Sequence, residues 1–494
     1  MKDKLNILLR RNPLFLYLLP VFFVVHGSAE NYDFVPLKDA VLLTIVYIIA
    51  SWILLLLFRL LYRNWMKAAL MAFFIMAFHF FFGSMHDGLK NILPGAFITK
   101  YLFILPLSLC LLALAVVLLK KSKRPLLKTA FYLNILFLLL IVLDAIMLTG
   151  KIISGRKNDT IFLIKRIYPC ANCNKPDVYV IITDEYAGNM ELKDIFHFDN
   201  TLFYDQLAQR NFHVIPNSSS NYNFTPYSIA SILNMDYLDL NRDNKQPLLA
   251  YSYQTIRNNQ LLQFLEYHQY KFYNYSFFDF KGQPAHTQET FLPVRTRLIT
   301  SQTFLSRLNK EIRFNLVTRF GSTSQTKLVT YANRENNETL FNLTLKTAAE
   351  KTKHPKFVLT HLMMPHYPYY YDKNGNEFPF ETLLEEEKYN QQHYIENLQY
   401  TNKKLLELAD HILKNSATPP VIIIMGDHGF RHFKQSVDVK YLFCNLMSVH
   451  LPGNNYSAFS DSMTTVNLFR TVLNTSFGQH LPYLKDTALI MDNQ

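Results

Sequence analysis

Cysteine is scarce in this chain, which has four cysteines among 494 residues. Cys110 and Cys444 lie in apolar segments, where a cysteine is most often an unreactive core residue. Cys170 and Cys173 form the sequence Cys-Ala-Asn-Cys, and a local disulfide between them is one interpretation. A zinc knuckle would need a second pair of cysteines, which the sequence lacks.

The chain also lacks a basic stripe interleaved with aromatic residues, the pattern typical of nucleic-acid-binding surfaces. Lys and Arg number 50 against 38 Asp and Glu, for a formal net charge of +12. Much of this excess flanks long apolar runs rather than forming one cluster. We therefore predict a lipid bilayer as the partner, and no nucleic acid.

Long apolar runs are abundant before residue 150. A helix needs roughly 20 residues to cross a bilayer. Five runs come near or exceed this length, at 13–29, 37–59, 66–85, 101–119 and 129–149. We predict a bundle of five transmembrane helices in residues 1–150, although the first run contains Pro20 and His26 and also resembles an uncleaved signal anchor.

Basic residues orient this predicted bundle. They concentrate at the N-terminus and in the second-to-third and fourth-to-fifth connections. The positive-inside bias then places the N-terminus in the cytoplasm, and five crossings place the C-terminal half outside. Basic residues after the last helix, such as Lys151 and Arg156, argue mildly against this topology, but they also suit contact with anionic lipid head groups.

The C-terminal half alternates short apolar strands with longer segments of helical period. After a juxtamembrane linker at 151–175, we expect a domain over 176–494. Its expected strands are 178–183, 211–215, 271–276, 357–361, 421–425 and 441–447. Its expected helices are 199–210, 226–234, 255–268, 338–351, 390–415 and 463–474. The alternation predicts an α/β domain with a mainly parallel sheet covered by helices on both faces, and excursions over the sheet edge by the polar segment 281–335.

Two of these strands end in acidic residues. The strand Val421–Ile424 leads into Asp427-His428, with a glycine on each side that permits a sharp turn, and the strand Val178–Thr183 leads into Asp184-Glu185. Open α/β sheets place their chemistry at strand ends. Asp and His are also ligands for divalent cations.

Thr225, followed by Pro226, precedes an apolar helical segment. One interpretation is a helix N-cap, which Thr favours, with proline at the first helical position. The other is a nucleophile, since a hydroxyl at a helix N-terminus meets free amides that attract a phosphoryl group, and a bound metal would lower its pKa. Asp184 and Asp427-His428 favour the second interpretation.

Asp184, Thr225 and Asp427-His428, in this order, resemble the sulfatase-like branch of the alkaline phosphatase superfamily. The segments that match its successive conserved blocks are 176–186, 217–233, 357–368 and 421–430, and the resemblance covers nearly all of 176–475. With five membrane helices before this domain, the chain is similar to lipid A phosphoethanolamine transferases and lipoteichoic acid synthases. The resemblance implies an integral protein of the bacterial cytoplasmic membrane, with its catalytic domain on the periplasmic or extracellular side.

The resemblance also implies the chemistry of the site. One divalent cation, Zn²⁺ or Mn²⁺, would be bound by Asp184, Thr225, Asp427 and His428. Thr225 would take the phospho-head group from a phospholipid donor and pass it to an envelope glycan or lipid acceptor.

Three further residues have weaker assignments. His366 matches a position that contacts the transferred phosphate or its leaving group, and the alternative is a loop histidine stacked on its neighbours. His432 is either a phosphate contact or a surface residue. Glu185 is an alternative to Asp184 as a ligand.

Two departures from the family pattern leave the substrate open. Thr225-Pro-Tyr-Ser-Ile does not match the Cys/Ser-x-Pro-x-Arg motif of true sulfatases, which argues against sulfate-ester hydrolysis. The chain also has fewer cysteines than the phosphoethanolamine transferases, so the transferred group stays open. The alternatives are a phosphodiesterase or phosphatase with water as acceptor, and a non-catalytic membrane receptor.

Overall fold

The computed structural model describes residues 2–30, 35, 37–93, 95–123, 125–158, 175–240, 248–281, 283, 285, 296–311, 326–327, 330–385 and 389–491. The chain forms two compact units. The first, the membrane unit, comprises Met1–Asp159 and Glu289–Phe320. The second, the sheet unit, comprises Thr160–Gln288 and Gly321–Gln494. Cys170 and Cys173 lie outside the described residues, so their predicted disulfide stays a prediction.

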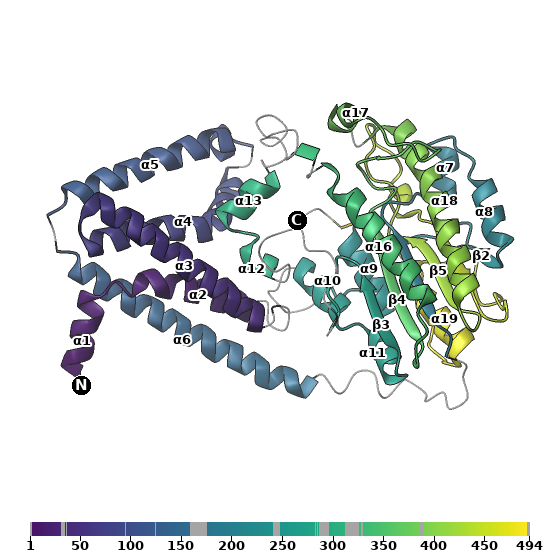
Figure 1. The fold of residues 1–494 in the computed structure, drawn as a ribbon, viewed down its shortest axis with the longest axis horizontal. Coiled ribbons are helices and arrows are strands. Elements are labelled where there is room, and N and C mark those ends of the chain that lie inside the picture. Colours follow the sequence, from purple (N-terminus) through teal and green to yellow (C-terminus); the bar gives the residue numbers. More distant parts are fainter. Residues whose placement is uncertain are drawn as a thin grey trace. The chain divides into compact units, whose positions relative to one another are not determined.

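The membrane unit consists of helices, which are seen in Figure 1. Their bounds are α1 Lys2–Arg11, α2 Phe15–Glu30, α3 Leu37–Tyr62, α4 Trp65–Ile92, α5 Tyr101–Lys121 and α6 Leu127–Asn158. Four of them, α3 to α6, are long and apolar enough to cross a membrane. The predicted first span corresponds to α2, which has 16 residues and a length of about 24 Å, less than the roughly 30 Å of a hydrocarbon core. Four of the five predicted spans are thus confirmed by length and composition.

Polar side chains on α6 connect it to α1, to the residue after α1, and to α2. The Asn134 side-chain amide donates to the backbone oxygens of Leu9 (2.7 Å) and Asn12 (2.8 Å). Asp144 lies 3.2 Å from the ring of His26. Polar groups among apolar helices are stable only when they are paired, and these pairs fix how α6 packs against α1 and α2. Cys110 on α5 is exposed rather than in a core, whereas Cys444 in the sheet unit is buried as expected.

Part of the predicted polar excursion belongs to the membrane unit. Residues 296–311 form the helices α12 (Arg297–Thr300) and α13 (Phe304–Glu311). The Phe304 ring packs against Phe82, with 4.9 Å between ring centroids, and Arg307 forms an ion pair with Asp87. Residues 296–311 of the predicted excursion therefore pack on helices of the membrane unit. Their apolar side chains pack on helices that are distant in sequence: Ile299 of α12 lies in a core shared with α2, and Phe304 of α13 packs on α4.

The sheet unit is built on six strands in the order β2-β6-β5-β1-β4-β3. Their bounds are β1 Val178–Thr183, β2 Phe212–Val214, β3 Lys271–Tyr275, β4 Lys356–Leu362, β5 Val421–Gly426 and β6 Met447–His450. β3, β4, β1 and β5 are parallel, whereas β6 is antiparallel to both β5 and β2. The sheet is therefore mixed.

The last strand differs from the prediction. Part of the expected strand 441–447 is a 3₁₀ helix, Val439–Phe443, and β6 begins only at Met447. A parallel crossover needs a connection of a dozen or more residues, usually with an α-helix. The connection from β5 to β6 contains no α-helix, and the chain returns antiparallel.

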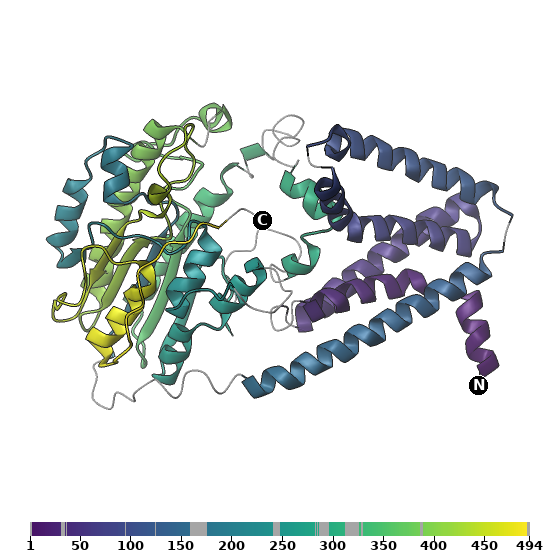
Figure 2. The ribbon, with the colours of Figure 1, turned by 180° about the vertical axis from the view of Figure 1, so that it is seen from behind.

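Helices cover both faces of the sheet, as predicted. Along β1, Val178, Val180 and Ile182 face one core, and Tyr179 and Ile181 face the other. The first core includes α9 (Thr225–Asn234), α10 (Leu248–Arg257), α11 (Gln260–Tyr267) and α19 (Leu468–Phe477), the last drawn in yellow in Figure 2. The second includes α7 (Asn189–Asp194), α8 (Thr201–Ala208), α16 (Ala332–Ala349) and α18 (Gln391–Asn415), and a further helix is α17 (Phe380–Glu385).

The predicted helix 255–268 is two helices. α10 ends at Arg257, and the Asn259 side chain accepts a hydrogen bond from the backbone N–H of Leu262 as the N-cap of α11. Asparagine is a favoured N-cap residue and so marks the start of a new helix. The apolar periodicity of the segment alone did not reveal this break.

Candidate metal and catalytic site

The register of the sheet brings the acidic strand ends together. Thr183 at the end of β1 pairs with Gly426 at the end of β5. Asp184 and Asp427 therefore leave the sheet at the same edge. On the other side of β1, Thr183 pairs with Leu362 of β4, which brings the segment that carries His366 to this edge as well.

The two glycines around Asp427-His428 are required by close packing. A Cβ atom on Gly426 would lie 2.8 Å from the backbone oxygen of Tyr186, and one on Gly429 would lie 2.2 Å from that of Tyr441. Neither glycine has a positive φ angle. The predicted sharp turn is therefore not why glycine is needed here.

Asp184, Asp427 and His428 form a buried group, which we call the first group. One ligand atom from each lies within 4.8 Å of the others, and each residue is at most 2% exposed. The Oδ1 of Asp184 and the Oδ2 of Asp427 have no hydrogen-bond partner. Buried carboxylate oxygens without partners are strongly unfavourable. Two such oxygens beside one imidazole fit a divalent cation.

The imidazole of His428 is oriented for metal binding. Its Nδ1 lies 2.8 Å from the backbone oxygen of Gly429, and donation of the Nδ1 proton to that oxygen leaves Nε2 as the free nitrogen. Burial, together with the positive charge of Arg431, lowers the pKa of His428 to about 4. The ring is therefore neutral at pH 7, which is the form that binds a metal.

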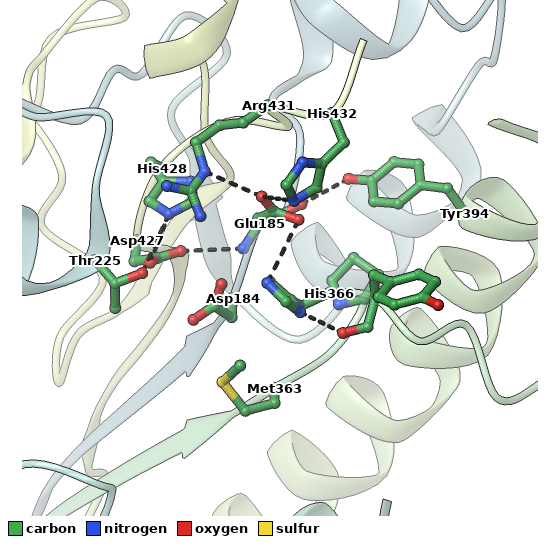
Figure 3. A network of polar contacts seen from close by, with 12 residues as sticks. Asp184, Glu185, Thr225, Met363, His366, Tyr394, Asp427, His428, Arg431 and His432 are labelled. Carbon is green, nitrogen blue, oxygen red and sulfur yellow. Dashed lines mark hydrogen bonds and ion pairs between the residues drawn. The ribbon is translucent and has the colours of Figure 1, made fainter. Parts of the chain in front are cut away.

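Thr225 joins the first group. It is the first residue of α9, and Phe224 occupies the N-cap position without a side-chain cap. The interpretation of Thr225 as the N-cap is therefore wrong. Its hydroxyl instead lies 3.2 Å from Nε2 of His428. Figure 3 marks this contact with a dashed line. The helix start thus directs the hydroxyl to the candidate metal site.

The two carboxylates of the first group have opposite pKa shifts. Burial and the negative charge of Asp184 raise the pKa of Asp427 to about 7. Burial alone raises the pKa of Asp184, but a hydrogen bond with His361 and other nearby imidazoles lower it to about 2. Two acids this close disfavour a second negative charge, and a bound cation would remove that repulsion.

A second group lies beside the first and comprises Glu185, His366 and His432, whose ligand atoms also lie within 4.8 Å of one another. Glu185 is fully buried, and its oxygens lie 3.2 Å from Nε2 of His432 and 3.8 Å from Nε2 of His366. The Arg431 Nε donates to Glu185 at 3.0 Å. Burial acts to raise the pKa of Glu185, but these histidines and Arg431 outweigh it and lower the pKa. Glu185 therefore belongs to a separate group from Asp184.

The structure thus places His366 and His432 together on Glu185. His366 is turned toward this carboxylate rather than toward solvent, and His432 is partly buried (Figure 3). Burial lowers the pKa of His366, but the charges of Glu185 and Asp184 have the larger combined effect and raise it. The position of His366 beside these carboxylates therefore favours its protonated form more than that of an isolated histidine.

Several residues near the site were not identified from the sequence. His361, on β4, is fully buried with its Nε2 3.3 Å from Asp184, and its ring packs on Phe277. The Tyr394 hydroxyl on α18 donates to the backbone oxygen of Glu185 at 2.7 Å. The one available signal was a histidine, His361, within a predicted strand of mostly apolar residues.

The sequence matches no protein-family model, and a search of curated proteins finds no similar sequence. Among solved structures, the C-terminal periplasmic domain of EcEptC from Escherichia coli is 14% identical, with a TM-score of 0.39, over 64% of this chain and 85% of that one. A structure of the same domain is described as a complex with Zn.

Two further solved structures are similar. The corresponding domain of phosphoethanolamine transferase EptC from Campylobacter jejuni is 13% identical, with a TM-score of 0.35, over 61% of this chain and 90% of that one. Phosphonate monoester hydrolase SpPMH from Silicibacter pomeroyi is 13% identical, with a TM-score of 0.39, over 63% of this chain and 75% of that one.

Proposed function

We propose that this protein is a membrane-anchored, metal-dependent phosphotransferase that works through a covalent phospho-threonine at Thr225. The observation that carries this proposal is the position of the Thr225 hydroxyl. It is free of any capping role, and it lies 3.2 Å from His428, beside two buried carboxylates with unpaired oxygens. A hydroxyl next to a cation site is the arrangement that nucleophilic phosphoryl transfer requires.

One divalent cation would be held by Asp184, Asp427 and His428, with the Thr225 oxygen as a further ligand. A ligand set rich in oxygen with one imidazole suits Zn²⁺ or Mn²⁺. Such a cation, when bound, lowers the pKa of a hydroxyl and polarises a phosphoryl oxygen.

In the first step, the Thr225 hydroxyl releases its proton to solvent, and its oxygen bonds to the phosphorus of the donor head group. The bond from phosphorus to the oxygen of the lipid alcohol breaks. His366 donates a proton to that oxygen, a role supported by its raised pKa and its position on Glu185. Arg431 adds positive charge near the transferred group. An envelope glycan or lipid hydroxyl accepts the group in the second step.

A phospholipid donor is supported by the four helices that are long and apolar enough to cross a membrane. We further propose that α2 makes the fifth crossing, because it is packed in one core with α3, α4 and α6. Five crossings would place the sheet unit on the periplasmic or extracellular side of a bacterial cytoplasmic membrane.

Intact-mass analysis of the full chain tests this proposal. The protein is incubated with liposomes of phosphatidylethanolamine or of phosphatidylglycerol, with Zn²⁺ or Mn²⁺. We expect a head-group adduct on Thr225 that is absent from Thr225→Ala. Thr201→Ala is a matched control, because Thr201 is likewise the first residue of a helix, α8, but is exposed.

Each outcome has a distinct meaning. An adduct of phosphoethanolamine or of phosphoglycerol mass identifies the transferred group. Free head group without an adduct supports a hydrolase that uses water as acceptor. Equal adducts in the wild type and Thr225→Ala refute Thr225 as the nucleophile, and metal-loaded protein that gives neither product refutes the proposed function.

A further inference from the structure

A cavity of about 920 Å³ lies in the sheet unit beside the second group. One wall is formed by residues 433–437, which directly follow Arg431 and His432 of the site. Successive Cα atoms are about 3.8 Å apart, and this wall begins at the residue directly after His432 of the second group. The Phe433 ring packs on Phe430 with 5.0 Å between centroids, which fixes the wall to the segment that carries His428.

The other walls come from the end of α7, from α17, and from the start of α18. This places the cavity at the same edge of the sheet as the strand ends, since Tyr394 at the start of α18 donates to the backbone oxygen of Glu185. The volume lies within the roughly 300–1,000 Å³ of small-molecule sites. The cavity is thus large enough for a ligand of several rings, and its wall continues the segment that carries Arg431 and His432.

The side chains of the cavity select the class of ligand. Primary amides (Gln391 and Gln435) and hydroxyls (Thr382 and Ser436) contribute groups that donate and accept hydrogen bonds. Tyr389 adds an aromatic ring. Sugar hydroxyls also donate and accept, and the C–H faces of sugars pack on aromatic rings.

The charges in the cavity argue against an anionic or acyl ligand. Lys434 lies over the Tyr389 ring, 4.1 Å from its centroid, and Asp194 accepts a hydrogen bond from the Tyr441 hydroxyl at 2.9 Å. Among the described residues that line the cavity, Lys434 and Asp194 carry one charge of each sign, which gives no strong field for a phosphate. Few of the lining residues are apolar, and an acyl chain would leave the amides and hydroxyls unpaired.

We infer that this cavity is the acceptor subsite and that it binds a neutral carbohydrate, an inference that rests on the proposed function. A hydroxyl of the bound sugar attacks the phosphorus of phospho-Thr225, the bond from phosphorus to the Thr225 oxygen breaks, and the sugar proton ends on that oxygen. The head group leaves as a phosphodiester of the sugar. Thr225 is regenerated.

Direct binding is tested by saturation-transfer NMR on the full chain in lipid nanodiscs, without sugar-based detergents. The probes are maltose, lactose and N,N′-diacetylchitobiose. We expect saturation transfer to at least one disaccharide, reduced at least fivefold in Gln391→Ala. Gln392→Ala is the matched control, because Gln392 is the next residue of α18, is exposed, and donates to Glu396 rather than lining the cavity.

A chase experiment tests the role in transfer. Thr225 is first loaded from liposomes, and the disaccharide that binds is then added at saturating concentration for the wild type. Gln391→Ala and Gln435→Ala should load as the wild type does but lose the adduct to the sugar at least tenfold more slowly. Gln392→Ala should behave as the wild type.

Three results separate the possibilities. Wild-type chase rates in both cavity variants overturn the inference, and so does the absence of saturation transfer to all three disaccharides. A wild-type protein that never loads Thr225 means that the proposed function has failed, and loss of the NMR signal in Gln391→Ala alone would then still support a carbohydrate site.

Discussion

Replacement of Asp427 by Asn should have opposite effects on stability with and without metal. Asp427 is fully buried, and its Oδ2 has no hydrogen-bond partner. The negative charge of Asp184 lies beside it. Without a cation, the folded protein must either protonate Asp427 or hold two charges together.

The size of this effect follows from the pKa of Asp427, which burial and Asp184 raise from 3.8 to about 7. Because the folded-state pKa is raised, the stability that this group contributes is fully present below pH 4 and is lost as the pH rises toward 7. The loss is about 1.4 kcal/mol per pH unit, or about 4 kcal/mol in total. Asn cannot ionise, and its Oδ1 can still accept from the Glu185 N–H, as that of Asp427 does at 3.1 Å.

In EDTA at pH 8, Asp427→Asn should therefore stabilise the folded state by up to about 4 kcal/mol, which raises the melting temperature by about 8 °C. With Zn²⁺ at 100 times its Kd, the wild type gains about 2.7 kcal/mol that the variant cannot gain. In Zn²⁺, the variant should then lose most of its gain in stability over the wild type. At higher Zn²⁺ concentrations its melting temperature should fall below that of the wild type.

Thermal unfolding of the full chain in nanodiscs, measured by intrinsic fluorescence from pH 5 to pH 8, tests this reasoning. Asp410→Asn is the control, since Asp410 is half-exposed and paired with Arg210. It should change the melting temperature equally with and without metal. If Asp427→Asn lowers the melting temperature in EDTA as much as in Zn²⁺, the two carboxylates do not repel each other and the reasoning is wrong.

Three further predictions follow from particular contacts. The affinity for Zn²⁺, measured by competition with a fluorescent chelator, should fall about tenfold per pH unit below pH 7, because Asp427 must lose its proton to bind; a constant affinity from pH 5.5 to 7 would contradict this. Burial raises the pKa of Glu191 well above its usual value, so the stability that Glu191 contributes is lost as the pH rises above about 4.5. Glu191→Gln should therefore raise the melting temperature more at pH 8 than at pH 5. An equal change at both pH values would refute this explanation. Arg307→Ala should destabilise the membrane unit by about 1–3 kcal/mol, because it removes the partly buried ion pair with Asp87. A double-mutant cycle with Asp87→Ala should give non-additive changes in the free energy of unfolding. Strictly additive changes would show that the pair contributes nothing.

The sequence by itself determined the elements that depend on local patterns. The apolar runs that form α3 to α6 exceed the length needed to cross a bilayer, and a run of that kind can be recognised without knowing its neighbours. β1 and β5 were predicted almost to the residue, because strands buried on both faces are continuously apolar. Acidic residues directly after such strands then identified Asp184 and Asp427.

Only the tertiary structure decided which residues meet. The second group combines Glu185 after β1 with His366 after β4 and His432 after β5, three segments whose proximity depends on sheet register. The docking of α13 on α4 likewise depends on contacts between segments more than 200 residues apart.

The position of Thr225 in its helix also required the structure, because the same Thr-Pro sequence suits an N-cap or a first helical residue. As an N-cap, the Thr225 hydroxyl would accept a hydrogen bond from a backbone N–H of its own helix. As the first helical residue, one position later, it faces His428. Sequence patterns report local periodicity and propensity, whereas this shift is set by packing of α9 against the sheet. The chemistry of the site is therefore readable in the sequence, but its geometry is a property of the folded chain.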